Sequence, residues 1–391
     1  MKTVEFFAGI GGFRIASDHF GMETVWANDI CPKACKVYKN RFGENSIREG
    51  DIREMLDDVP PHDLLTGGFP CQPFSSAGKK QGIKDPRGTL FSAIVEMLKR
   101  HKPRFFVLEN VKRLLQMEKG IHFATILASL ARLDYLIEWR LLNAVHFGLP
   151  QNRQRVFIVG VRIDESASEN GKSSGTLPIR LATPNDISRL SPNEIGWICS
   201  PNEWTDIAAH GVQFPNWGLA RSTRFFAANL EDFSAKKPQA LLNSVLQKEV
   251  PKQFDFTSST LERIGDSIEV NRFIDGVETL SNQKGGARMG YTVFGINGVA
   301  PTLTSTTSRH YERYRVGNRY RRLTNVEYAR IQGFPDDHCS VISVYDQYAL
   351  FGNAVPPPMA EWVLGRLSEK GMALRNIPRK AMQRGLFVDA Y

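Results

Sequence analysis

The first 163 residues alternate short apolar segments with segments of helical spacing, and this alternation limits the fold more than any other feature. Apolar runs bounded by glycine, proline or polar residues predict strands at residues 4–8, 24–27, 63–66, 105–109 and 156–161. Amphipathic spacing predicts helices at residues 13–20, 32–41, 90–100 and 122–133. We therefore predict an α/β fold with a mostly parallel, twisted sheet and helices on both faces. Such a sheet binds ligands beyond the carboxyl ends of its strands.

The rhythm stops after a polar stretch at residues 164–176, whose composition (DESASENGKSSGT) is typical of a linker. Residues 177–320 contain prolines, glycines and scattered aromatics without regular spacing, which predicts an irregular, β-containing second domain. Helical spacing returns at residues 324–332 and 358–367. The chain is therefore expected to have a large α/β domain and a smaller second domain.

The composition is that of a soluble globular protein, with 42% hydrophobic and 23% charged residues. No apolar run approaches the roughly 20 residues of a membrane span, and the glycine-interrupted N-terminus lacks the apolar core of a secretion signal. We therefore expect a cytoplasmic protein. The five cysteines include no Cys-x-x-Cys and the eight histidines show no ligand spacing, which argues against a disulfide framework and against a metal site. A net charge of +9 fits a polyanionic partner, although a soluble basic protein fits it equally well.

A glycine-rich turn, FFAGIGG at residues 6–12, joins the first predicted strand to the first predicted helix. Glycines let a ligand approach the backbone, and a helix N-terminus favours an anionic group. Arg14 stands where the dinucleotide fingerprint has its third glycine, which disfavours NAD. Asp29 follows the second strand and is placed to bind ribose hydroxyls, while Asp51 and Ile52 could meet an adenine ring. A tight structural turn without a ligand is the alternative.

Cys71 follows the third predicted strand within GGFPCQP, where glycines and prolines constrain the turn. This placement is typical of a nucleophile, although a single cysteine is more often structural. The next segment, residues 75–88 (SSAGKKQGIKDPRG), is glycine-rich and basic and predicts a loop that closes over a phosphodiester backbone. Phosphate contacts would come from Lys79, Lys80, Lys84 and Arg87. A solvated surface loop is the alternative.

Glu109 ends the next buried strand within LENV, on the same rim of the sheet as Cys71. Arg153 and Arg155 alternate within QNRQR at the start of a strand, so their side chains project to one face. An unpaired acid at a sheet end would cost stability unless a site required it. A carboxyl group, a thiol and two arginines on one rim therefore indicate an active site.

These motifs, in this order, resemble those of the DNA cytosine-5 methyltransferase family, of the prokaryotic restriction-modification type. The resemblance rests on FAGIGG, PCQ, ENV, QNRQR, LTNVEYARIQGFP and GNAVPP, and it covers residues 2–163 and about 321–368. It implies a Rossmann-like, S-adenosylmethionine-dependent catalytic domain at residues 1–165, completed by residues 340–391. Residues 177–339 would then form the target-recognition domain and include the helix motif that follows it.

The resemblance also implies the roles of the site residues. Cys71 would add to C6 of a flipped-out cytosine, which activates C5 toward the methyl group of S-adenosylmethionine. Glu109 would hold the N3 and amino edge of the ring, and Arg155, together with Arg153, would contact O2. The cofactor would be bound by Phe7, Gly9, Gly11, Asp29, Asp51, Ile52, Leu90, Asn353 and Val355.

The expected partner is double-stranded DNA. The residues expected to contact it are Ser75, Lys79, Arg87, Arg288, Thr302, Leu303, Arg309, Arg313 and Arg315. Thr302 and Leu303 match a Thr-Leu pair of the family, and arginines interleaved with tyrosines at residues 309–322 suit guanine and phosphate contacts. A cognate restriction endonuclease would act on the same sequence without direct contact, and the methyltransferase is expected to be monomeric.

Three other functions stay open on the sequence. A tRNA cytosine-5 methyltransferase on the same scaffold would carry a Cys-Phe-Thr signature and a short recognition region, and this chain has neither. A non-catalytic DNA-binding relative would not need Cys71, Glu109 and Arg155 together. A nucleotide-dependent dehydrogenase is opposed by the missing third glycine.

Overall fold

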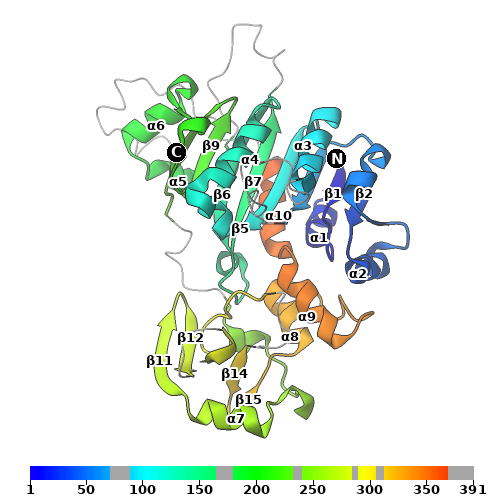
Figure 1. Cartoon of the computed structure of the whole chain (residues 1–391), viewed down its shortest axis with the longest axis vertical. Helices are drawn as coiled ribbons and strands as arrows, with labels where there is room; N and C mark the ends of the chain where they lie inside the picture. The colour runs from blue at the N-terminus through cyan, green and yellow to red at the C-terminus, as the bar shows by residue number, and fades with distance from the viewer. Residues whose placement is uncertain (71–88, 164–178, 232–239, 284–288, 305–311, 369–391) are drawn as a thin grey trace, which may run out of the picture.

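The computed structural model describes residues 1–70, 89–163, 179–231, 240–283, 289–304 and 312–368. These residues form a large lobe built on a ten-stranded sheet and a small lobe built on a five-stranded sheet (Figure 1). No helix within these ranges has both the length and the apolar character needed to cross a membrane.

The large sheet has the strand order β3-β2-β1-β4-β5-β7-β6-β9-β10-β8. Its first seven strands along the chain are β1 (Lys2–Phe6), β2 (Glu23–Asp29), β3 (Arg48–Glu49), β4 (Leu64–Gly68), β5 (Phe105–Val111), β6 (Tyr135–Asn143) and β7 (Gln154–Arg162). The strands from β3 to β5 in this order are parallel, and β7 is antiparallel to both β5 and β6. The carboxyl ends of β4, β5 and β6 and the start of β7 therefore share one rim of the sheet.

Helices cover both faces of this sheet, as predicted from the alternating sequence. One face packs against α3 (Thr89–His101) and α4 (Ile121–Ala131), with Ile94 and Leu127 fully buried between them and the strands. The other face packs against α1 (Gly12–His19) and α10 (Pro357–Ser368), where Phe13 and Val363 are buried. Helix α10, the last helix of the described residues, thus completes the layer that begins near the N-terminus, and α2 (Pro32–Phe42) lies beside β2.

Residues that were expected in the second domain instead extend the large sheet. Strands β8 (Thr205–Asp206), β9 (Trp217–Arg221) and β10 (Arg224–Ala228) join it through antiparallel pairing of β9 with β6. Trp217 and Leu219 are fully buried in the cluster that holds β9 against its neighbours. The second domain was expected to start at residue 177, but residues 205–228 bury their apolar side chains on the large sheet. The small lobe therefore starts later in the chain than expected.

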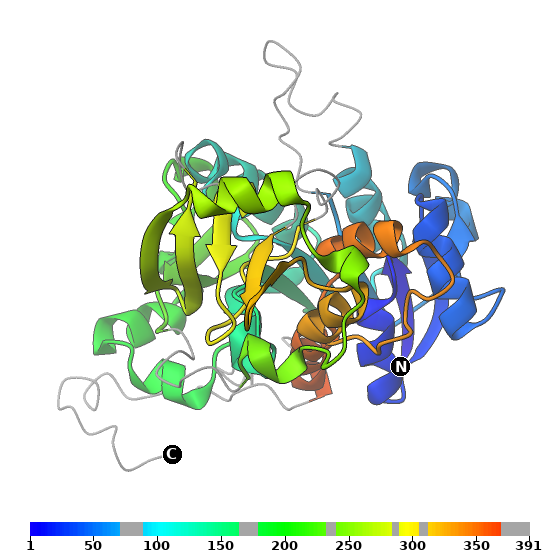
Figure 2. The same ribbon diagram turned by 90° about the horizontal axis from the view of Figure 1, so that it is seen from below.

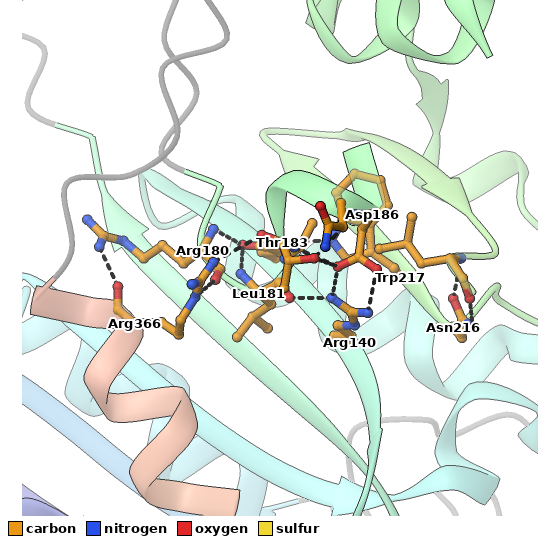
Figure 3. Close-up of polar contacts among 12 residues, drawn as sticks. Arg140, Arg180, Leu181, Thr183, Asp186, Asn216, Trp217 and Arg366 are labelled. Atoms are coloured by element: carbon orange, nitrogen blue, oxygen red, sulfur yellow. Dashed lines mark hydrogen bonds and ion pairs between the residues drawn. The ribbon is translucent and has the colours of Figure 1, made fainter. Parts of the chain in front are cut away.

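A buried polar network fixes this extension, together with α5 (Pro184–Ser188), to the large lobe (Figure 3), and α6 (Pro192–Ile198) follows α5 along the chain. The Glu138 carboxylate of β6 accepts hydrogen bonds from the backbone N–H of Ala182 at 2.9 Å and from the Trp217 indole at 2.8 Å. Arg140, also on β6, forms a buried ion pair with Asp186 at 2.6 Å. Each buried charge in the network thus has partners that offset its desolvation.

The small lobe is built on the strands β11 (Ile268–Ile274), β12 (Val277–Asn282), β13 (Thr292–Phe294), β14 (Arg313–Val316) and β15 (Arg319–Arg321). It also contains α7 (Ser258–Gly265), and α8 (Asn325–Gln332) and α9 (Val344–Asn353) lead back to the large lobe. Seen from below, the helices α8–α10 lie beside the N-terminal strands and helices (Figure 2). One hydrophobic cluster contains Ile10 and Val37 of the large lobe together with Tyr328 and Phe351, so the two lobes share a core.

Candidate active site

The rim of the large sheet brings together three of the predicted motifs. Gly68, at the end of β4, pairs with Glu109 on β5, and Val111 of β5 pairs with Arg155 on β7. The described chain after β4 continues to Pro70 and resumes at α3. The predicted nucleophile and loop contacts, Cys71, Ser75, Lys79 and Arg87, lie outside the described residues.

Glu109 and Arg155 form an ion pair at the centre of this rim. The Arg155 Nε atom lies 2.9 Å from Glu109 Oε1, and both residues are buried. Burial raises the pKa of the Glu109 carboxyl group above its usual value, while the charges of Arg155 and Arg153 oppose that shift. The site therefore contains a carboxyl group that holds a proton at a higher pH than an exposed glutamate does.

Asn110 holds the turn that leads to Cys71, a role that the sequence analysis did not assign. Its Nδ2 donates a hydrogen bond to the Phe69 carbonyl oxygen at 2.9 Å, and its Oδ1 accepts from the Val111 backbone N–H at 2.9 Å. The side chain is buried, so both bonds are protected from water. The available signal was the position of this asparagine directly after Glu109, at the end of a buried strand.

Arg153 is bonded away from the position predicted for it. Its Nη1 donates to the Leu303 carbonyl oxygen at 3.0 Å, and its Nη2 donates to the carbonyl oxygens of Gly352 and Ala354 at 2.9 Å. A contact between Arg153 and the cytosine ring would require the loss of these buried bonds. The two arginines predicted to be catalytic thus have different contacts. Arg155 contacts Glu109, and Arg153, just before β7, is bonded to residues from two distant parts of the chain.

The turn between β1 and α1 has the backbone conformation that its glycines allow. Gly9 and Gly11 have φ values of 55° and 85°. Phe7, which directly follows β1, has a φ of 54°. The Gly9 N–H donates to Asp29 Oδ2 at 2.8 Å, and the Cys31 N–H donates to Asp29 Oδ1 at 2.8 Å. A Cβ atom at Gly9 would meet no atom within 4 Å, so open space adjoins the turn.

Val355 lies between this turn and Glu109. A Cβ atom on Gly12 would stand 2.1 Å from the Val355 carbonyl oxygen, so the backbones approach as closely as only glycine permits. A Cβ atom on Gly68 would stand 3.3 Å from Glu109 Oε2 and 3.5 Å from Val355 Cγ2. The β1–α1 turn, the rim at β4 and β5 and the segment around Val355 therefore lie close together. Asn353, which ends α9 two residues before Val355, has an exposed side chain.

The other predicted cofactor residues have different environments. Asp51 caps the short helix η1 (Ile52–Glu54) and pairs with Arg53, whose hydrogen bonds lower the pKa of the Asp51 carboxyl group. Ile52 is buried in the core cluster, so only its backbone reaches a ligand without rearrangement. Leu90 is half-buried in the first turn of α3 and packs against the same cluster.

The predicted DNA contacts divide in a similar way. Arg288 and Arg309 lie outside the described residues. Thr302 is half-buried and its hydroxyl donates to the Asn152 carbonyl oxygen at 2.6 Å, whereas Leu303 is fully buried. The Leu303 side chain fills the core shared by the lobes, so only its backbone could reach DNA without rearrangement, and its DNA contact stays a prediction. On β14, Arg315 is exposed and Arg313 is largely buried.

Within the described part of the chain, no group of three or more His, Cys, Asp and Glu side chains is arranged to hold a metal ion. The described part of the rim carries the Glu109 carboxyl group, the Arg155 guanidinium group and the turn that leads to Cys71.

Comparisons with known proteins find a family match and similar proteins along most of the chain. The profile of the family described as C-5 cytosine-specific DNA methylase matches residues 1–369. The type II methyltransferase M.BanI of Aneurinibacillus aneurinilyticus is 32% identical over an alignment of 419 positions, gaps included, which covers 95% of this chain and 96% of that protein. The type II methyltransferase M1.ScrFI of Lactococcus lactis subsp. cremoris is 31% identical over an alignment of 379 positions, gaps included, which covers 94% of this chain and 78% of that protein.

Solved structures support the fold. The Dnmt2 methyltransferase of S. pombe has a TM-score of 0.58 at 16% identity, with 94% of this chain and 98% of that chain covered. A DNMT2 mutant of Spodoptera frugiperda has a TM-score of 0.61 at 18% identity, with 94% and 99% covered. At these identities the similarity concerns the architecture of the two lobes.

Proposed function

Because the chain belongs to the C-5 cytosine-specific DNA methylase family, we propose that Cys71, Glu109 and Arg155 are the residues with which it methylates cytosine. The enzyme transfers a methyl group from S-adenosylmethionine to C5 of cytosine in DNA, as the type II methyltransferases similar to it indicate. The observation that carries the residue assignment is the buried Glu109–Arg155 pair, at 2.9 Å, on the rim next to the turn before Cys71.

The reaction needs a nucleophile because C5 of cytosine does not attack a methyl donor by itself. The Cys71 thiolate forms a bond to C6, and N3 takes a proton, so that the ring becomes an enamine whose C5 is nucleophilic. C5 would then accept the methyl group from S-adenosylmethionine, whose S–CH3 bond breaks to leave S-adenosylhomocysteine, and N3 would return its added proton. Removal of the C5 proton by a base restores the double bond, the Sγ–C6 bond breaks, and the thiolate is released. Because C6 is inaccessible in a stacked duplex, the cytosine must first leave the helix.

Glu109 suits the proton step through its burial. Its pKa is raised above that of an exposed glutamate, so the carboxyl group can hold a proton and donate it to N3 when the thiolate attacks. Arg155 lies against the same carboxyl group, from where its guanidinium group can donate hydrogen bonds to O2 of the ring. Glu109 and Arg155 would thus stabilise the charge that develops on the pyrimidine at two neighbouring atoms, N3 and O2.

The β1–α1 turn fits S-adenosylmethionine, which supplies the methyl group. Open space at Gly9 accommodates the methionine portion, and the Asp29 carboxylate at the end of β2 can accept hydrogen bonds from ribose hydroxyls. Val355, in the segment between α9 and α10, would contribute to this cofactor site. We place Phe7, Gly11, Asp51, Ile52, Leu90 and Asn353 around the same ligand.

Target recognition is assigned to the small lobe, whose sheet carries the exposed Arg315. The proposal keeps catalysis at residues 1–165 and 340–391 and places recognition within residues 177–339, in the part that forms the five-stranded sheet, because residues 205–228 belong to the large sheet. The similarity to type II methyltransferases supports a cognate restriction endonuclease that cuts the same sequence. A monomeric, cytoplasmic enzyme that protects DNA fits this role.

Nucleoside mass spectrometry tests the function directly. The purified enzyme, incubated with S-adenosylmethionine and either duplex DNA or tRNA, is expected to produce 5-methylcytosine in the DNA alone. Bisulfite sequencing of the product then locates the modified cytosine. Methylation of tRNA in place of DNA would favour the tRNA enzyme, and methylation of neither would favour a non-catalytic relative.

A further inference from the structure

A second polar site lies on the catalytic rim, beyond the Glu109–Arg155 pair. A pocket of about 280 Å³ opens where the ends of β6, β7, β9 and β10 meet the short helix η3 (Lys112–Leu115). It is lined by Lys112, Leu115, Gln116, Leu141, Leu142, Asn143, Gln154, Gln213, Phe214, Asn216 and Asn229. Six of these residues carry side-chain amides and none carries a carboxyl group, so the lining is rich in hydrogen-bond donors and has no negative charge.

The pocket adjoins the active site but lies on the other face of the sheet. Gln154 directly precedes Arg155 on β7, and successive side chains of a strand point to opposite faces. Gln154 also pairs with Asn143, and Lys112 follows the residue that pairs with Arg155. A ligand in the pocket would therefore lie beside the cytosine site without overlapping it.

The walls of the pocket are fixed before any ligand binds. The Phe214 N–H donates to the Leu115 carbonyl oxygen at 3.0 Å, and the Leu141 N–H donates to the Asn216 carbonyl oxygen at 2.7 Å. The Asn216 side chain donates to the Leu230 carbonyl oxygen at 2.7 Å and accepts from its N–H at 2.8 Å. Figure 3 shows Asn216 and Trp217 in the same view as the Arg140–Asp186 pair, which joins β6 to α5. Such a frame reduces the entropy lost on binding.

Four polar side chains of the lining have no partner of their own. Among the described residues, no hydrogen bond or ion pair engages the side chains of Lys112, Gln116, Gln154 or Gln213. An ammonium group neutralises a phosphate, and amide side chains hydrogen-bond base edges or phosphate oxygens. The chemistry therefore matches an anionic group that also carries several acceptors.

We propose that this pocket binds a nucleotide of the substrate duplex outside the flipped cytosine, with Lys112 on its phosphate. The proposal rests on the DNA substrate assigned above. It adds a contact from the large lobe that is made partly by residues 213–216, just before β9. A nucleotide held in this pocket would fix the duplex along the rim of the large sheet. Its contact would lie on the side of the duplex opposite the base-contacting residues proposed for the small lobe.

DNA binding and methylation measured as functions of salt test the proposal. The variants are Lys112→Ala, Gln213→Ala and their combination, and Lys99→Ala is the matched control because Lys99 is exposed at the end of α3 remote from the rim. The probe is a duplex that carries the site located by bisulfite sequencing. The double variant is expected to raise the KM for DNA about tenfold with kcat retained, and Lys112→Ala should reduce the slope of log K against log salt by about one.

Unchanged KM and salt slope in the double variant would overturn the pocket assignment, as would an equal loss in Lys99→Ala. Thermal unfolding of each variant serves to confirm that the exposed substitutions leave the fold intact. The test separates this proposal from the proposed function, because binding is measured by fluorescence anisotropy independently of methylation. If the unaltered enzyme bound DNA through Lys112 but methylated nothing, the catalytic assignment would fail while the pocket assignment held.

Discussion

Burial of carboxyl groups determines much of the chemistry at the residue scale. Glu109 is buried against Arg155, and its raised pKa is the property that a proton donor to N3 requires. Replacement by glutamine keeps the shape and the hydrogen-bonding capacity but removes the transferable proton. We predict that Glu109→Gln lowers kcat on the order of 100-fold or more, with the dissociation constant for S-adenosylhomocysteine nearly unchanged. Single-turnover methylation and calorimetric titration measure the two effects, and near-normal turnover would remove Glu109 from the proton step.

Glu5 provides a pH prediction that is independent of catalysis. It is buried on β1 and accepts a hydrogen bond from the Tyr38 hydroxyl at 2.8 Å. Burial raises its pKa to about 8, against an ordinary value of 4.5. Because the folded pKa is raised, the stabilisation from the bound proton is fully present below about pH 4.5 and is lost as pH rises toward 8.

Glu5→Gln should therefore gain stability relative to the unaltered protein as pH rises from 5 to 8.5, by a few degrees in Tm. Exposed Glu23→Gln is the matched control and should show a constant difference across the range. Scanning calorimetry in matched buffers gives both curves. A pH-independent difference for Glu5→Gln would mean that Glu5 is ionised in the folded protein.

The sequence motifs indicated which residues to assign to the site, and those assignments stay predictions, whereas the contacts of these residues were only partly predictable. Glu109 and Arg155 were expected on one rim of the sheet, with Glu109 as an unpaired acid. Neither its ion pair with Arg155 nor the position of antiparallel β7 beside β5 was predicted. Arg153 was grouped with Arg155 because alternate residues share a face. Its partners, Leu303 and Gly352, lie about 150 and 200 positions away in sequence, and no local pattern indicates them.

At the element scale, the β1–α1 turn depends on the segment between α9 and α10. A Cβ atom on Gly12 would stand 2.1 Å from the Val355 carbonyl oxygen, which belongs to backbone that cannot swing aside as a side chain would. We predict that Gly12→Ala destabilises the fold by about 1–3 kcal/mol and weakens S-adenosylmethionine binding at least tenfold. Gly265→Ala at the end of α7, where a Cβ atom meets nothing within 4 Å, is the control. Equal cofactor affinity in both variants would contradict the proposed role of the C-terminal segment.

The strand extension shows where prediction from sequence stops at this scale. Strands β8 to β10 are short, and Gly218 interrupts the apolar run of β9, so the segment resembles irregular structure. In the fold, a Cβ atom on Gly218 would stand 2.3 Å from the Trp139 ring, so glycine is required by packing across β6 and β9. The pairing partner β6 precedes β9 by about 80 positions, and a local reading of the sequence does not include it.

At the scale of the whole molecule, the two lobes share one core but carry separate sheets. This arrangement predicts that the small lobe can change the target without changing the chemistry. Exchange of residues 240–321 for the counterpart of a relative with another target should move the methylated sequence, as bisulfite sequencing would show. An active chimera that keeps the original target would place recognition elsewhere, with the pocket on the catalytic rim as the first candidate.

The central claim is that Cys71 forms a covalent bond to C6 during methyl transfer, and the last step of that route gives its most direct test. Release of the enzyme requires loss of the C5 proton, and fluorine at C5 cannot leave in its place. Duplex DNA with 5-fluorocytosine at the target position should therefore trap the enzyme in a complex that survives denaturing electrophoresis. The complex should require S-adenosylmethionine, its peptide map should contain Cys71, and Cys71→Ser should not form it. Absence of any covalent species on a duplex whose unfluorinated form is methylated, or attachment through another cysteine, would contradict the account.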